Sequence, residues 1–181
     1  MLYAAYGDEW TGPAPTTSPL MNIFAISSDP IQCAQALDDK RLNKMIVETC
    51  QILCAALHLT NRGSQSLYKA AYLRHPIVLW ATADDRNYAW LYRHLIALFE
   101  ERSFRTGKRD HRSTRLIPEL GLHVCADAAP AAFENCTAYK SVEDVHAAYQ
   151  QTLCDKWQND SQPPRWTNRG APEFYKAQST G

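Results

Sequence analysis

Hydrophobic positions along the chain recur with the period of an α-helix. The clearest run extends from Asp38 to Leu59, where positions three or four residues apart form one apolar face: Leu42, Met45, Ile46, Thr49, Ile52, Leu53, Ala56 and Leu57. A face of this kind predicts an amphipathic helix that packs against a core. The turn-forming residues 61–64 are expected to end it.

Helix start and stop signals predict four further helices. Asp29 followed by Pro30 is typical of a helix start, because aspartate caps the first turn and proline suits its first position. Gly107 is a stop signal. The expected segments are about 29–37, 75–80, 84–104 and 142–157. Strand signals are few, so we predict an all-α fold, a compact single-domain helical bundle.

Composition divides the chain into three parts. Its 181 residues suit one domain. Residues 1–20, rich in glycine, proline, alanine and threonine, are expected to be an N-terminal extension, and Met21 offers an alternative start. Residues 21–160 would then form a helical catalytic or binding domain, and residues 161–181 a C-terminal tail that packs on that domain.

Charge and cysteine content narrow the class of protein. Basic and acidic residues both number 19, so contact with nucleic acid would need a local basic patch. The six cysteines form no C-x-x-C pair and are expected to be reduced, buried thiols. No apolar run reaches the length of about 18 residues that a membrane span needs, and the start does not resemble a secretory signal. We therefore expect a cytoplasmic protein that does not contact a membrane.

One stripe of the predicted helix at 38–59 carries candidate chemistry. Lys40, Lys44 and Glu48 are spaced at i, i+4 and i+8, so they share one side of the helix. The simpler interpretation is a solvated face with an ordinary Lys44–Glu48 pair. The functional interpretation is a catalytic site, because two lysines one turn apart, with Arg41 beside them, make an amine a more available nucleophile. The same lysines could instead hold phosphates.

A dense basic run follows the predicted helix at 84–104. It comprises Arg102, Arg105, Lys108, Arg109, Arg112 and Arg115. Cations at a helix C-terminus suit the helix dipole, which is one explanation. In a chain with no net charge, the clustering favours the other explanation, a phosphate-binding patch in which Arg105, Lys108 and Arg109 are candidate contacts.

Aromatic residues provide a candidate contact to a nucleobase. Trp80 and Trp90 could stack a nucleobase, with His75 and Asn87 beside them, although tryptophans at helical spacing are also typical of a core. In the C-terminal tail, Trp166 lies between arginines and turn residues. It could close over a ligand or tie the tail to the core.

Several strong enzyme signatures are missing from the sequence. It contains no P-loop, G-x-G-x-x-G, H-E-x-x-H, G-x-S-x-G or EF-hand pattern. We therefore expect neither a metal nor a cofactor, and the oligomeric state stays open.

Taken together, several segments make the chain similar to a group of phage proteins, which are in turn distantly similar to the pyrimidine-dimer DNA glycosylases of the endonuclease V type. The matching positions are Met21-Asn22-Ile23-Phe24, Asp29-Pro30, Asp39-Lys40, Lys44-Met45-Ile46-Val47-Glu48, His75-Pro76, Trp80, Asn87-Tyr88-Ala89-Trp90-Leu91 and Arg105-Thr106-Gly107-Lys108. The resemblance implies a compact all-α enzyme with an aromatic C-terminal segment, acting in a phage-infected bacterial host.

The resemblance also implies a mechanism, from which this chain departs. Those glycosylases attack the sugar C1′ with an N-terminal amine, form a Schiff base and use one glutamate. Here about twenty residues precede Asn22, and the position expected for the glutamate falls near Asn43 and Lys44. We therefore expect Lys40 or Lys44 to replace the amine and Glu48 to assist, unless the fold serves another task.

Four hypotheses remain open on these residues. The first is a DNA glycosylase or base-modifying enzyme, which would flip a base out of the duplex. The second is a transferase for thymine-base hypermodification. The third is a protein that binds or degrades a small nucleotide, such as a cyclic immune signal, because a small anion needs only a few cations. The fourth is an interaction domain without activity.

Overall fold

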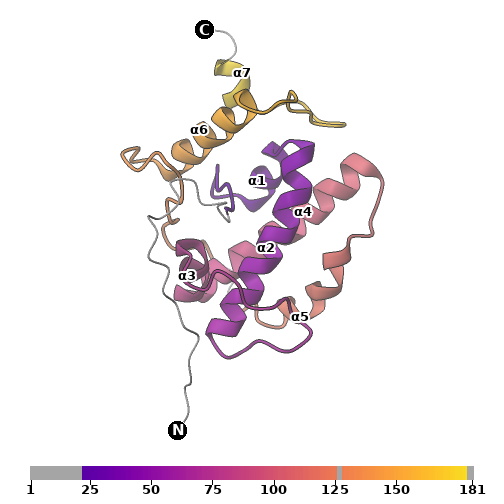
Figure 1. Cartoon of the computed structure of the whole chain (residues 1–181), viewed down its shortest axis with the longest axis vertical. Coiled ribbons are helices and arrows are strands. Elements are labelled where there is room, and N and C mark those ends of the chain that lie inside the picture. Colours follow the sequence, from indigo (N-terminus) through magenta and orange to yellow (C-terminus); the bar gives the residue numbers. More distant parts are fainter. Residues whose placement is uncertain (1–21, 126–127, 179–181) are drawn as a thin grey trace.

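The computed structural model describes residues 22–125 and 128–178, and in these ranges every regular element is helical (Figure 1). The elements are α1 (Pro30–Ala36), α2 (Asp39–Leu59), α3 (Pro76–Ala83), α4 (Asp85–Thr106), the 3₁₀ turn η1 (Arg112–Leu116), α5 (Ile117–Gly121), α6 (Val145–Gln158) and α7 (Glu173–Gln178). The predicted all-α class is confirmed. The expected extension at 1–20 and the alternative start at Met21 lie outside the described residues.

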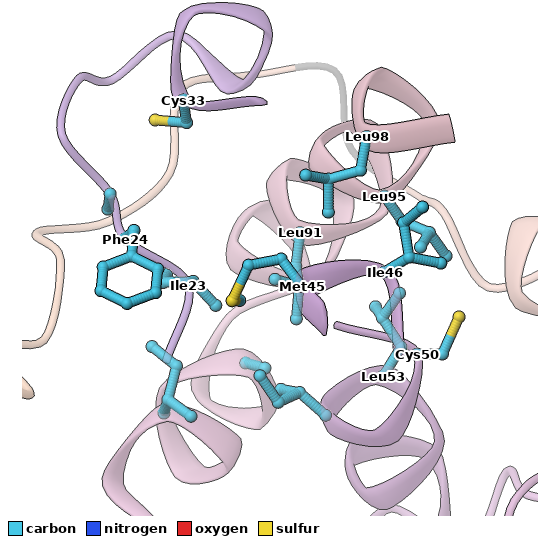
Figure 2. Close-up of a cluster of buried hydrophobic side chains, with 14 of the residues drawn as sticks. Ile23, Phe24, Cys33, Met45, Ile46, Cys50, Leu53, Leu91, Leu95 and Leu98 are labelled. Atoms are coloured by element: carbon cyan, nitrogen blue, oxygen red, sulfur yellow. The ribbon is translucent and has the colours of Figure 1, made fainter. Parts of the chain in front are cut away.

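Helices α2 and α4 form the centre of the bundle. α2 packs against α3 and α4, and α1 packs against α4. Figure 2 shows Met45, Ile46 and Leu53 of α2 close to Leu91, Leu95 and Leu98 of α4. All eight positions of the predicted apolar face of α2 are buried. The period of the sequence therefore identified correctly which side of α2 turns inward and which side stays free for chemistry.

The helix boundaries follow the capping residues. Asp29, Asp84 and Asp144 each accept a hydrogen bond from a backbone N–H of the first turn of α1, α4 and α6. Gly107 ends α4 in the left-handed conformation, with φ of 69°. α6 begins three residues later than expected because Asp144 caps it. α3 reaches Ala83, beyond the expected end at residue 80.

His75 has a structural role in the same scheme. It is the N-cap of α3, and its Nδ1 accepts a hydrogen bond from the backbone N–H of Ile77 at 3.2 Å. The cap occupies Nδ1 and gives His75 a structural reason to be here. A contact between His75 and substrate stays a prediction.

The tryptophans of the predicted base-stacking cluster belong to the core. Trp90 is only 1% exposed, and its indole N–H donates to the carbonyl of Ser28. Trp80 stacks on Phe133, and its indole N–H donates to a backbone carbonyl. Asn87 is buried, with both ends of its amide bonded to backbone groups. The expectation that these residues contact a base is wrong, because no face of them is free to stack one.

A buried ion network joins the tail to the first and last turns of the two central helices. Arg105 of α4 pairs with Glu101 at 2.7 Å and with Asp39 at 2.9 Å, and its side chain is 1% exposed. Arg169 of the tail forms two bonds to the same Glu101, at 2.6 and 2.7 Å. The guanidinium of Arg105 is therefore buried and paired with Asp39 and Glu101. The expectation that Arg105 contacts a phosphate is wrong.

Aromatic packing holds the tail in the same place. Trp166 lies edge-on to Trp157 of α6, with ring centroids 5.1 Å apart, and its indole N–H donates to the carbonyl of Ala36. Phe174 and Tyr175 also pack on Trp157. Of the two interpretations of Trp166, the structure favours the one in which it ties the tail to the core.

Two smaller findings bear on the class of protein. None of the helices in the described part of the chain combines the length and apolar character of a membrane span. The six cysteines form no disulfide, and five are buried, whereas Cys125 is exposed.

His94 gives the fold a sensitivity to acid. Its ring lies fully buried against Trp90, Nδ1 donates to the carbonyl of Pro30, and Nε2 finds no partner among the described residues. Burial lowers the pKa of His94 from 6.5 to about 4. Between these two pH values, His94 is therefore protonated in the unfolded chain and neutral in the folded protein.

We predict that the free energy of unfolding falls as the pH drops from 6.5 toward 4, by about 3 kcal/mol from this group. Urea titrations across this range should show a shallower fall for His94→Phe, which keeps the ring packing and cannot be protonated. Equal slopes for the two proteins would contradict the assignment.

Candidate functional site

One cavity brings together the charged residues that the sequence singled out on α2. It has a volume of about 390 Å³ and lies between the segment at 22–24, the first half of α2, the loop at 136–138 and α6. Its charged lining comprises Lys40, Arg41, Lys44, Glu48 and Lys156, and the remaining lining residues are Asn22, Phe24, Cys136, Thr137, Ala138 and Thr152. The predicted stripe of α2 therefore faces a cavity large enough to admit part of a ligand.

The segment before α1 is bent to form one wall. Phe24 adopts a φ of 42°, and the side-chain oxygen of Asn22 accepts a hydrogen bond from its backbone N–H at 2.8 Å. A left-handed conformation costs a residue with a side chain about 1–2 kcal/mol. Such strain is found most often at functional sites. The bend places Asn22 and Phe24 in the lining of the cavity that also contains Glu48.

Lys44 and Glu48 form the only ion pair in the lining with a carboxylate oxygen to spare among the described residues. Nζ of Lys44 lies 3.1 Å from Oε1 of Glu48, whose side chain is 13% exposed. The second oxygen, Oε2, is buried and has no hydrogen-bond partner among the described residues. A carboxylate oxygen without a partner costs stability, so its retention here favours a role in chemistry. The pair places an amine and a proton acceptor side by side.

Lys40 and Arg41 are engaged with carboxylates at the rim. Asp160 accepts from Lys40 at 2.8 Å and from Arg41 at 2.7 Å. Arg41 also pairs with Asp38 at 3.0 Å. The hydrogen bonds from Lys40 and then Arg41 lower the pKa of Asp160. Lys40 is therefore held by a carboxylate outside the cavity lining, whereas the partner of Lys44 lies within it, so Lys44 is the better placed of the two candidate amines.

Lys156 is a site residue that the sequence did not reveal. It comes from the last turn of α6, outside any recognisable motif, and lines the cavity with Lys44 and Glu48. Its pKa is lowered by burial first and then by the nearby Arg41 and Lys44, whereas Glu48 and Asp160 oppose the shift. A lone lysine on an amphipathic helix gives no sequence signal, because only the docking of α6 brings it here.

The basic run divides between structure and surface. Arg102 donates to the side-chain oxygen of Asn43 on α2 and to the carbonyls of Lys108 and Asp110, so it fixes the loop beside the first half of α2. The side-chain oxygen of Asn43 therefore helps to hold Arg102 and the loop after α4 in place. Lys108 and Arg109 are exposed on that loop and remain candidates for phosphate contacts. The structure leaves His75, Trp80, Asn87, Trp90 and Trp166 outside the cavity lining.

Comparison with known proteins gives one match. The family model described as pyrimidine dimer DNA glycosylase matches residues 21–115, just over half of the chain. No curated protein and no solved structure matches. The matched region contains Asn22, Lys44 and Glu48, whereas Thr152 and Lys156 of the same cavity lie beyond it.

The unpartnered oxygen of Glu48 leads to a prediction that separates function from stability. Glu48→Met should leave the free energy of unfolding unchanged or raise it by about 1 kcal/mol, because it removes a buried polar atom and only a partly exposed ion pair.

Glu101→Met is the matched control, a change of the same kind in α4. Since Glu101 binds both Arg105 and Arg169, this variant should lose about 3 kcal/mol. Denaturant unfolding of both variants measures the difference. A loss at Glu48 as large as that at Glu101 would show that Glu48 is a structural residue.

Proposed function

The chain belongs to the pyrimidine dimer DNA glycosylase family, and on this premise we propose that it is a DNA glycosylase/lyase or base-modifying enzyme that uses Lys44 as its amine and Glu48 as its acid and base. The observation that carries the proposal is the Lys44–Glu48 pair, with its spare carboxylate oxygen, in the lining of the cavity. We further propose that it acts in the cytoplasm of a phage-infected bacterial host.

The pair supports the first half of the reaction without a cofactor. Glu48 takes a proton from Lys44, and the neutral amine attacks the sugar C1′. The bond between C1′ and the base breaks, its electron pair leaves with the base, and the acid of Glu48 supplies the proton that neutralises it. Ring opening then converts the attached amine into a protonated Schiff base: the sugar ring oxygen takes up one of the two protons that the nitrogen still carries, and the other stays on the Schiff base.

The second half uses the same carboxylate as a base. Glu48 removes a proton from C2′, and the bond from C3′ to its oxygen breaks, with the phosphate as leaving group. Water then hydrolyses the Schiff base and frees Lys44. The products are a released base and a nicked strand. Two residues therefore suffice for both bond cleavages, because the carboxylate alternates between its two protonation states.

Binding would require the target nucleotide to leave the duplex. A base inside a stacked duplex cannot reach an amine in a cavity, so the nucleotide must flip out. The exposed Lys108 and Arg109, held beside α2 by Arg102, would contact the backbone. We also propose that residues 21–160 form the functional domain and that residues 161–181 close against it, on the contacts of Arg169 and Trp166.

A small nucleotide is the second candidate ligand. The chain carries no net charge, whereas Lys40, Arg41, Lys44 and Lys156 converge on one cavity of about 390 Å³. A few converging cations suit a small anion, and a duplex favours a broad basic face. The same lysine stripe would also serve a transferase that modifies thymine bases, for which an activated base would be the substrate.

We predict that the protein nicks a duplex carrying a single thymine dimer, and that borohydride traps a covalent protein–DNA adduct. Lys44→Ala should abolish the adduct, and Glu48→Gln should slow nicking by about 10²–10⁴-fold, the usual contribution of a general acid or base. Single-turnover nicking assays and denaturing gels measure both effects.

Lys69→Ala is the control, since Lys69 is an exposed lysine between α2 and α3 that does not line the cavity. It should nick at the wild-type rate. Absence of nicking and of adduct with wild-type protein, together with tight binding of a mono-, di- or cyclic nucleotide, would replace the glycosylase proposal by the nucleotide one.

A further inference from the structure

The charges in and around the cavity balance except at one residue. Two lysines and one arginine of α2 pair with three carboxylates: Lys40 with Asp160, Arg41 with Asp38 and Asp160, and Lys44 with Glu48. Lys156 adds a fourth cation from α6, and it makes no hydrogen bond or ion pair within the described part of the chain. The cavity therefore carries one positive charge that no carboxylate of residues 22–125 or 128–178 pairs with directly.

We propose that Lys156 binds a backbone phosphate of the DNA strand next to the target nucleotide and so positions the sugar over the Lys44–Glu48 pair. The proposal rests on the proposed function, because it takes damaged DNA as the ligand. It names a binding residue outside the region that the family model matches. Lys156 is a positioning residue here and takes no part in bond cleavage.

The surroundings of Lys156 favour an anion over any other ligand. The charged groups near it are Arg41, Lys44 and Glu48 on α2 and Asp160 in the segment that follows α6. Both of these carboxylates already bond other cations. An ammonium group in such a place gains most from a new anionic partner, and a phosphate oxygen provides a charge-assisted hydrogen bond.

The position of Lys156 makes that phosphate a neighbour of the reacting sugar. Lys156 and Thr152, one turn apart on α6, line one side of the cavity, and Lys44 and Glu48 line the side formed by α2. A nucleotide that presents C1′ to Lys44 must carry its own phosphates along the cavity rim. Contact with one of them would fix the sugar in the orientation that the attack needs.

The electrostatics add a pH signature. Burial, Arg41 and Lys44 lower the pKa of Lys156 in the free protein, and a bound phosphate would raise it again. Binding is then coupled to proton uptake, so DNA affinity should fall as the pH rises through the lowered pKa of Lys156. Arginine at this position stays charged and would remove that part of the pH dependence.

The test combines a protein change with a substrate change. A duplex with one thymine dimer is prepared in a series in which each phosphate near the dimer is replaced in turn by a neutral methylphosphonate. Nicking by wild-type protein, Lys156→Ala and Lys156→Arg gives KM and kcat for each duplex. Lys69→Ala serves as the matched control for loss of one positive charge.

With the natural backbone, Lys156→Ala should raise KM by about tenfold or more, as expected for loss of a charged hydrogen bond. Lys156→Arg should restore KM and show a flatter dependence of KM on pH below the usual pKa of a lysine, where the wild-type side chain loses its proton. One methylphosphonate position should raise KM for wild type and leave KM of Lys156→Ala unchanged, which identifies the contacted phosphate.

Two results would overturn the proposal. In the first, the losses from Lys156→Ala and from every methylphosphonate position simply multiply, so that the residue and the phosphates act independently. In the second, Lys156→Ala behaves like Lys69→Ala. Either result leaves nicking by wild-type protein intact and is therefore distinguishable from failure of the glycosylase function, in which wild-type protein nicks none of the duplexes.

Discussion

The packing of α2 against α4 is the constraint on which the rest of the molecule depends. It buries one face of a helix of 21 residues and leaves the opposite side, with Lys40, Lys44 and Glu48, in the lining of a cavity. A fully buried aliphatic side chain contributes about 1.5–3 kcal/mol, so the apolar face of α2 fixes the rotation of the helix about its axis. That rotation places the amine and the carboxylate where a ligand can meet them.

The second half of the chain supplies the other walls of the cavity that α2 lines. α6 supplies Thr152 and Lys156 to the far side of the cavity, and the loop before it supplies Cys136 and Thr137. The docking of α6 is supported by Trp157, whose indole N–H donates to Asp38 at the start of α2 and whose ring packs against the tail. The cavity is therefore formed between regions distant in sequence.

Individual elements show which parts of the fold and of the site can be predicted from the sequence alone. The period of α2 and the caps of α1 and α4 were readable because apolar spacing and capping act locally. Trp90 and Arg105 were misread as ligand contacts, because their partners, a backbone carbonyl near α1 and the carboxylates of Asp39 and Glu101, come from elsewhere in the fold. Lys156 was missed for the same reason: its meaning depends wholly on tertiary contacts.

The central claim is that Lys44 of α2 is the nucleophile, and peptide mapping of the borohydride-trapped adduct tests it most directly. Wild-type protein trapped on duplex DNA with a thymine dimer would be digested, and the peptide bearing the sugar remnant sequenced by mass spectrometry. We predict a remnant on Nζ of Lys44. A remnant on Lys156, on Lys40 or on an α-amine would contradict it, and would move the nucleophile to another group of the same enzyme.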